Sequence, residues 1–240
     1  MTDLPNILFA GDPHGDFRPI VRSALARKPD SVVLLGDYDL ARPLHDEMKP
    51  VVDAEIPVHW IAGNHDFDTE ACHDRLFLSD LKAANLHRRV AFVGKMSLTG
   101  LGGVMKTRVW DEQNRPIYKT RADLLRRYKR AERFRGGLPL DIADAIFHDD
   151  LEWIANRRFD IIVMHEAPTT HEQGWPVLDD IVRRSRAKFV VHGHHHKDYR
   201  AQLGDTTVIG VGKSGVASLV ETVVPGLHEQ GRTFSSVGSR

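Results

Sequence analysis

The chain has 240 residues, enough for one domain with a full hydrophobic core or for two small domains, and one domain is the simpler expectation. Its 33 Lys and Arg residues balance its 33 Asp and Glu residues, so no net charge attracts nucleic acid or an anionic membrane. Stable nucleic-acid binding is therefore not expected. The single cysteine, Cys72, excludes an internal disulfide and indicates a reducing compartment. It stands in a polar stretch, which favours an inert thiol over a nucleophile.

The N-terminal stretch MTDLPNILFAGD has only a short apolar run and no basic leader, so it predicts a core strand and not a signal peptide. Nothing elsewhere approaches the roughly 18 consecutive apolar residues that a membrane span needs. We therefore expect a cytoplasmic protein that makes no membrane contact.

Short apolar runs rich in Val and Ile alternate with helical patterns along the chain. The runs predict buried strands of a largely parallel sheet at 6–10, 31–35, 58–62, 160–164 and 188–192, with helices at 19–27, 44–54, 69–84 and 140–157. Segments 90–94 and 96–103, and likewise 206–212 and 217–224, suggest antiparallel hairpins joined by Gly-Lys or Lys-Ser-Gly turns. The predicted class is α/β, with two mixed sheets face to face and helices outside. We expect one domain over residues 1–224 and a loose tail over 225–240.

Potential metal ligands follow each of the five predicted buried strands. Because ligands collect at the carboxyl ends of strands in such sheets, these side chains are expected at one edge. Residues two apart point the same way in an extended segment, so Asp12 and His14 can reach one point, as can His194 and His196. By the same spacing, His195 faces away, as a structural residue or part of the substrate rim.

Seven side chains at these strand ends are candidate ligands. That number is too large for a single tetrahedral zinc, and two metal ions with Asp37 as a bridge fit better. The excess positive charge would attract a phosphoryl group, and the paired ions would activate a bridging hydroxide as nucleophile. His65 is placed to donate a proton to the leaving oxygen, with Asp66 fixing its tautomer. The candidate ligands are Asp12, His14, Asp37, Asn64, His165, His194 and His196.

Five short motifs, in this order and at these intervals, resemble the sequence blocks of the calcineurin-like metallophosphoesterase superfamily. They are GDPHG (11–15), GDYD (36–39), GNHD (63–66), MHEAP (164–168) and GHHH (193–196). The resemblance implies a four-layer αββα sandwich of the compact bacterial type, with a binuclear site for Mn, Fe, Zn or a similar ion, Mn being the expected ion in vitro. It also implies that Asp12, His14, Asp37 and His196 hold one ion, that Asp37, Asn64, His165 and His194 hold the other, and that His65 is catalytic and, with Asn64, contacts the substrate.

The substrate is less well defined than the chemistry. The sequence GDYDLARP lacks the Asp-Arg-Gly that phosphoprotein phosphatases of the superfamily carry after the second block, which weakens that alternative. A catalytically silent scaffold for protein binding is the other alternative, but such members lose ligands that are all present here. We expect hydrolysis of a phosphate mono- or diester, with a nucleotide or another small phosphoester as substrate. The sequence does not indicate the oligomeric state.

A basic segment within residues 104–139 is not explained by the common scaffold. Leu124, Tyr128 and Ala131 recur at helical spacing within 119–135, which predicts an amphipathic helix with strongly basic outer faces. It is either a solvated surface or a lid that steers phosphorylated substrates. In the lid interpretation, Arg126 and Arg127 contact the substrate.

Overall fold

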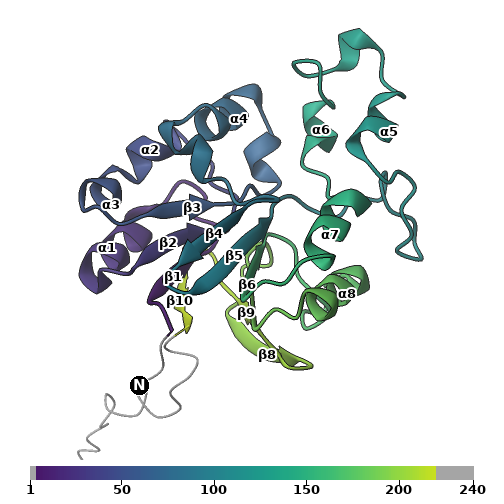
Figure 1. The fold of residues 1–240 in the computed structure, drawn as a ribbon. Helices are drawn as coiled ribbons and strands as arrows, with labels where there is room; N and C mark the ends of the chain where they lie inside the picture. The colour runs from purple at the N-terminus through teal and green to yellow at the C-terminus, as the bar shows by residue number, and fades with distance from the viewer. Residues whose placement is uncertain (1–3, 220–240) are drawn as a thin grey trace, which may run out of the picture.

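The computed structural model describes residues 4–219 and shows two β-sheets packed between helices (Figure 1). The smaller sheet has the strand order β10-β1-β2-β3, with β1, β2 and β3 parallel and β10 antiparallel to β1. Its strands are β1 (Ile7–Ala10), β2 (Ser31–Leu34), β3 (Val58–Trp60) and β10 (Val216–Ser218).

The larger sheet has the order β4-β5-β6-β7-β9-β8, in which β5, β6, β7 and β9 are parallel and the edge strands β4 and β8 are antiparallel. Its strands are β4 (Val90–Val93), β5 (Met96–Leu101), β6 (Ile161–Met164), β7 (Phe189–His192), β8 (Tyr199–Leu203) and β9 (Thr206–Gly210).

Helices cover the outer face of each sheet, which gives the predicted four-layer αββα sandwich (Figure 1). The smaller sheet is covered by α1 (Arg18–Arg27), α2 (Leu44–Glu47), α3 (Lys49–Asp53) and α4 (Glu70–Phe77), and the larger by α7 (His148–Ala155) and α8 (Pro176–Ser185). Two short helices, α5 (Arg121–Leu125) and α6 (Leu140–Ala143), stand beyond the sheets. The 3₁₀ turns are η1 (His65–Phe67), η2 (Asp80–Ala84) and η3 (Arg130–Glu132).

The continuous apolar runs of the central strands are explained by burial on both faces. Side chains alternate across a strand, so in β1 Ile7 and Phe9 join the core between the sheets, whereas Leu8 and Ala10 pack under α1 and α3. The same division holds in β6, where Ile161 enters the core between the sheets. These cores fix the ends of the parallel strands, where the candidate ligands lie.

Three of the predicted helices are interrupted, each for a local reason. The predicted helix 44–54 breaks into α2 and α3 because Pro50 cannot occupy a helix interior. The predicted helix 69–84 ends at Phe77, where Ser79 turns to an extended backbone and donates its hydroxyl to the carbonyl of Leu76 at 2.9 Å. In 140–157, the Asp150 carboxylate accepts the N–H of Phe147 at 2.9 Å and starts a new helix.

Two further predictions need correction. The second hairpin is wrong, because β9 pairs with β7 and β8 in the larger sheet while β10 pairs with β1 in the smaller one. The basic segment 119–135 is not one helix: only α5 and η3 are helical, and the guanidinium of Arg133 donates to the carbonyls of Leu125 and Tyr128 at the break between them. The helix α8 and the strand β8 were not predicted. The predicted tail 225–240, and most of the predicted strand 217–224, lie outside the described residues.

Candidate metal centre

The loops that follow β1, β2 and β3 in the smaller sheet meet the loops that follow β6 and β7 in the larger one. Backbone and side-chain hydrogen bonds hold them together: His14 N–H donates to the carbonyl of Asp37 at 3.1 Å, and His194 N–H donates to Oδ2 of Asp12 at 2.9 Å. The second bond joins the two sheets. All seven predicted ligands are thereby placed at one edge of the sandwich.

The first group of potential ligands consists of His14, Asp37 and His196, whose donor atoms lie within 4.8 Å of one another. The Nε2 atoms of His14 and His196 face each other at 3.1 Å, and Oδ2 of Asp37 lies 4.0 Å from Nε2 of His14. When two nitrogens bind the same ion at about 2.1 Å each, with their bonds to the ion at right angles, the nitrogens lie about 3 Å apart. The spacing of the two imidazoles therefore fits a shared cation.

The second group consists of Asp37, His165 and His194, and again its donor atoms lie within 4.8 Å. Nε2 of His165 lies 3.3 Å from Oδ2 of Asp37 and 3.2 Å from Oδ1 of Asn64. Asp37 thus belongs to both of these groups, whereas a third group of donor atoms, on Glu166, His194 and His195, does not include it. A carboxylate shared between two sets of ligands is the arrangement that a bridged pair of ions requires.

Asp12 lies beside these groups without being a member of either three-residue set. Its side chain is fully buried, and its Oδ1 atom has no hydrogen-bond partner among residues 4–219. That atom is 3.7 Å from Nδ1 of His165. A buried carboxylate oxygen without a donor is costly unless it binds a cation. Together with the imidazoles, it completes a set that suits Mn, Fe or Zn.

Two of the histidines are oriented by partners on their far side. Nδ1 of His14 donates to Oδ2 of Asp39 at 2.7 Å, and Nδ1 of His165 donates to the carbonyl of Leu35 at 2.7 Å. Each bond leaves Nε2 to face the ligand groups, as is usual for metal-binding histidines. Asp39 was not predicted, although it stands two residues after Asp37 in the GDYD motif.

The expectation of an extended backbone at the ligand pairs is wrong. Five of the seven predicted ligands have a left-handed backbone: Asp12 (φ 33°), His14 (φ 40°), Asp37 (φ 54°), His194 (φ 69°) and His196 (φ 52°). Such conformations cost about 1–3 kcal/mol each for residues other than glycine. The loops curl so that His194 and His196 reach different ligand groups, and do not form one pair.

Two glycines of the motifs are required by the close approach of the ligands. A Cβ atom on Gly193 would lie 2.7 Å from Oδ1 of Asp12, and one on Gly63 would collide with Oδ1 of Asp37. Any larger residue would displace these carboxylates. This explains why glycine immediately precedes both His194 and Asn64.

Burial and charge at the centre favour a cation. Burial raises the pKa of the Asp12 carboxyl to about 6. Burial also acts against ionisation of Asp37, but the charge of His165 and their hydrogen bond outweigh it and hold the pKa of Asp37 well below its usual range. For His165, burial is outweighed by Asp37 and Asp12, which raise its pKa to about 10. The buried carboxylates of Asp12 and Asp37 therefore favour a positive charge between them.

His65 lies beside the ligands at the open side of the centre, with its ring centroid 5.4 Å from that of His14 and a side chain 44% exposed. The predicted contact between His65 and Asp66 is wrong. Nδ1 of His65 donates instead to Oδ2 of Asp68 at 2.7 Å. Asp66 points away and accepts the backbone N–H groups of Gly63, Tyr38 and Asp37 at 2.7, 3.0 and 3.1 Å. Asp66 braces the loops after β2 and β3.

His192, the last residue of β7, lies outside the ligand groups. This side chain is buried, and Nε2 bonds to the hydroxyl of Tyr199 at 2.6 Å. The ring of His195 stacks on His171 at 4.0 Å, and its buried Nε2 is 3.5 Å from Oε1 of Glu166 without an aligned hydrogen bond in the described chain. Glu166 was not predicted, although it follows His165 directly.

Arg126 is exposed just after α5, where it pairs with Asp123 at 3.0 Å, and Arg127 is also exposed.

The family model for calcineurin-like phosphoesterases matches residues 5–198, which include every one of the candidate ligands. The chain belongs to the calcineurin-like phosphoesterase family. It is a phosphoric ester hydrolase, and the family is metal-dependent. Membership accounts for the five motifs at the strand ends and for the donor set that they bring together.

Individual proteins are similar to this phosphoesterase in sequence or in fold. An uncharacterized protein of Haemophilus influenzae is 33% identical over 193 residues, which cover 80% of this chain and 84% of that one. The fold is similar to the crystal structure of TT1561 of Thermus thermophilus (TM-score 0.57, 17% identity, 88% of this chain and 90% of that one). It is also similar to phosphopantetheinyl hydrolase (PptH) of Mycobacterium tuberculosis (TM-score 0.54, 15% identity, 94% and 100%).

The helices differ from membrane spans in length and polarity. Within residues 4–219, each helix is too short or too polar to cross a bilayer.

Proposed function

We propose that the protein is a binuclear phosphoesterase that hydrolyses small phosphate mono- or diesters, with nucleotides as the leading candidates. The observation that carries this proposal is the position of Asp37, whose carboxylate belongs to both ligand groups. Two divalent ions held there would polarise the phosphoryl oxygens and lower the pKa of a water between them toward about 7.

The residues around the centre have separate tasks in this proposal. Asp12 and Asp37 are buried and neutralise part of the charge of the ions, so the centre keeps an excess positive charge that attracts phosphate. His65 is exposed on the open side and donates a proton to the leaving oxygen, with its ring held by Asp68. The Asn64 amide contributes a neutral oxygen beside His165.

Two alternatives make different predictions. A serine/threonine-type phosphoprotein phosphatase would prefer phosphopeptides to small phosphoesters. A scaffold for protein binding would need neither the ligands nor His65, but the ligands converge and the fit of the two imidazole nitrogens to a shared ion favours an enzyme.

The test is an assay with Mn²⁺ on chromogenic phosphomonoesters and phosphodiesters, with a phosphopeptide for comparison. We expect turnover of the small esters that depends on added metal and is lost on chelation. An inactive protein that nevertheless binds Mn²⁺ would support the scaffold, and preferential turnover of the phosphopeptide would support the phosphatase.

A further inference from the structure

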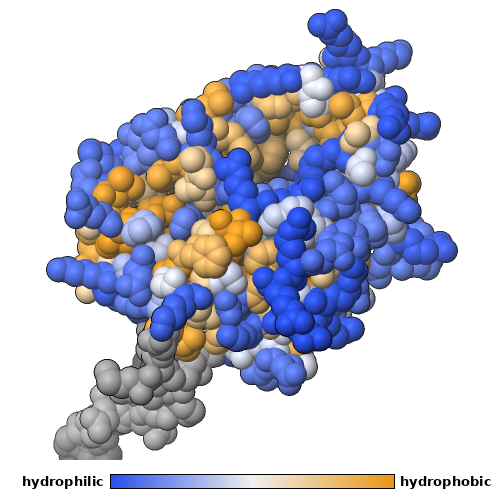
Figure 2. All heavy atoms as spheres, viewed as in Figure 1, coloured by the Kyte–Doolittle hydropathy of each residue, from blue (hydrophilic) through white to orange (hydrophobic). Residues whose placement is uncertain are grey.

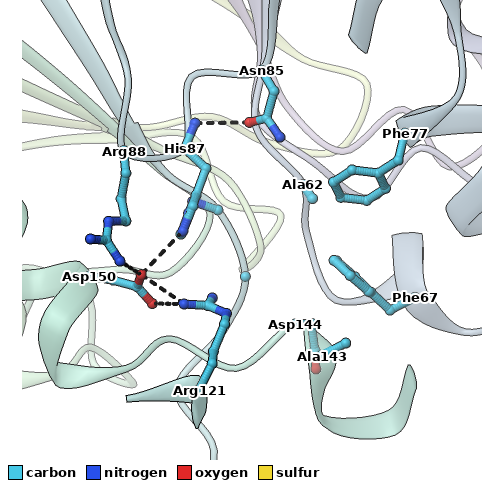
Figure 3. Close-up of a pocket in the computed structure, with 12 residues that line it drawn as sticks. Ala62, Phe67, Phe77, Asn85, His87, Arg88, Arg121, Ala143, Asp144 and Asp150 are labelled. Atoms are coloured by element: carbon cyan, nitrogen blue, oxygen red, sulfur yellow. Dashed lines mark hydrogen bonds and ion pairs between the residues drawn. The ribbon is translucent and has the colours of Figure 1, made fainter. Parts of the chain in front are cut away.

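A cavity of about 430 Å³ lies outside the ligand groups, with Phe77 of α4 on one side and residues of α5, α6 and α7 on the other (Figure 3). One wall is aromatic, formed by Phe67 and Phe77. The opposite wall is formed by His87, Arg88 and Arg121 around Asp150. In Figure 2, apolar atoms gather in a hollow between the regions of α4 and of α5 and α6.

This cavity is connected with the metal centre through shared residues. Phe67 and Asp144 also line a smaller cavity of about 270 Å³ together with Asn64 and Lys106. Asn64 and Lys106 in turn line the cavity beside His194. From these shared lining residues we infer a path along which a molecule with its phosphate at the metal centre would extend past Asn64 to Phe67.

The charges along this path are already paired within the protein. Nη1 of Arg121 lies 2.6 Å from Oδ2 of Asp150, and Nη1 of Arg88 lies 2.9 Å from Asp149 and 3.1 Å from Asp150. Lys106 pairs in the same way with Asp144 at 2.8 Å. Because each cation faces a carboxylate, the path does not favour a second phosphate group. It favours an uncharged part of the substrate.

The aromatic wall is positioned to bind a flat ring. The rings of Phe67 and Phe77 are 5.4 Å apart and tilted by 57°, so a flat ligand ring can lie parallel to only one of them. Phe77 is held in place by His73, stacked at 4.5 Å, and by Trp60 at 5.4 Å. Asn85 presents a polar group nearby: its Oδ1 accepts the N–H of His87 at 2.9 Å, which leaves its NH₂ group, directed toward Ala62 and Phe77, as a donor (Figure 3). A planar ring with hydrogen-bond acceptors matches both features.

We propose that this cavity binds the uncharged heterocycle of a nucleoside, stacked on Phe77 with Phe67 at its edge, while the phosphate of the same nucleotide lies at the metal centre. The position of the phosphate rests on the proposed function, whereas the binding of the ring depends only on the cavity. Volume and lining fit a small-molecule subsite, because such sites are mostly apolar with a few directed polar groups.

The cavity can be tested without metal or catalysis by measuring adenosine binding to the metal-free protein by saturation-transfer NMR. Ribose, which has no aromatic ring to stack, is the control ligand. We expect adenosine to bind and ribose not to bind. Phe77→Leu, which keeps an apolar side chain, should weaken adenosine binding about tenfold, because stacking on an aromatic ring is lost. Ala143→Phe should abolish it by filling the cavity from α6. Phe92→Ala, an exposed position on β4, is the matched control and should bind as the wild type does.

Turnover separates a failure of this inference from a failure of the proposed function. With Mn²⁺ we expect kcat/KM for a nucleoside monophosphate to exceed that for glycerol phosphate, and the ratio to fall about tenfold in Phe77→Leu, the same loss of stacking. Equal turnover of both esters without adenosine binding would overturn the subsite and leave the phosphoesterase standing. Adenosine binding that is unchanged in Phe77→Leu and Ala143→Phe would also overturn it. Ring binding that depends on Phe77, in a protein with no turnover of any phosphoester, would support the subsite and contradict the proposed function.

Discussion

Oδ2 of Asp37 lies 3.3 Å from Nε2 of His165, while the same oxygen is 4.0 Å from Nε2 of His14. Because one carboxylate serves both groups, Asp37→Asn should impair both ion sites at once. We expect metal content to fall below one ion per chain and kcat/KM to fall by more than about 10²-fold, since even residues that only hold a metal ligand in place contribute about 10–100-fold. Metal analysis and steady-state kinetics test this. Asp53→Asn, an exposed carboxylate on α3, is the control, and a variant at Asp37 that retained two ions would contradict the shared role.

The pair of His65 and Asp68 gives a second prediction. His65→Ala should lower kcat by about 10²–10⁴-fold, the usual contribution of a general acid. Asp68→Asn should lower it by about 10–100-fold, because the 2.7 Å bond that holds the ring is weakened. Metal content should stay at the wild-type level in both. A kcat of Asp68→Asn equal to that of the wild type would contradict the positioning role of Asp68.

The gathering of the ligands at one edge could be predicted because the periodicity of apolar runs identifies parallel strands, whose carboxyl ends are adjacent. Asp12, Asp37, Asn64 and His165 were placed correctly at strand ends on this basis. Sequence patterns fail where the local backbone decides the direction of a side chain. Left-handed conformations at His194 and His196 send these side chains to different groups, which no alternation rule describes and which only the resemblance to the metallophosphoesterases implied.

Partners within the motifs were missed or misassigned for the same reason. Asp66 and Asp68 both stand close to His65, and only the 3₁₀ turn η1 determines that Asp68 faces the ring. In the fold, the pairing of β10 with β1 was not predictable from its turn residues, because strands next to each other in sequence here belong to different sheets. Long-range packing, not local propensity, therefore determines which strand β10 pairs with.

Asp150 gives a prediction for stability and its pH dependence. Its side chain is fully buried, and although burial opposes ionisation, His87 and Arg121 hold the pKa of Asp150 below its usual value of 3.8. A depressed pKa in the folded state means that ionised Asp150 stabilises the protein above about pH 4, and that this contribution is lost as the pH falls below about 4.

We expect Asp150→Asn to lower the free energy of unfolding at pH 7 by about 3 kcal/mol, the lower end for a broken buried pair because the guanidinium groups are partly exposed. The difference from wild type should shrink as the pH falls toward about 2. Urea denaturation of metal-free protein at several pH values measures both. Asp149→Asn, at the neighbouring and more exposed carboxylate, should cost less than about 1 kcal/mol. Equal losses in the two variants would argue against the buried network.

The basic segment gives a prediction that depends on salt. Arg126, Arg127 and Arg130 are exposed, so any effect on an anionic substrate acts through the field at the surface. Replacing all three by Gln should raise KM a few-fold at low ionic strength. The effect should vanish near 1 M salt, where the Debye length is about 3 Å. A KM that does not change at any salt concentration would exclude the lid and leave a solvated surface.

The central claim is that two cations lie on either side of Asp37. Anomalous diffraction from crystals grown with Mn²⁺ tests it most directly. We predict two peaks about 3.5–4 Å apart, one beside His14 and His196 and the other beside His165 and His194. A single peak, or peaks away from Asp37, would contradict it.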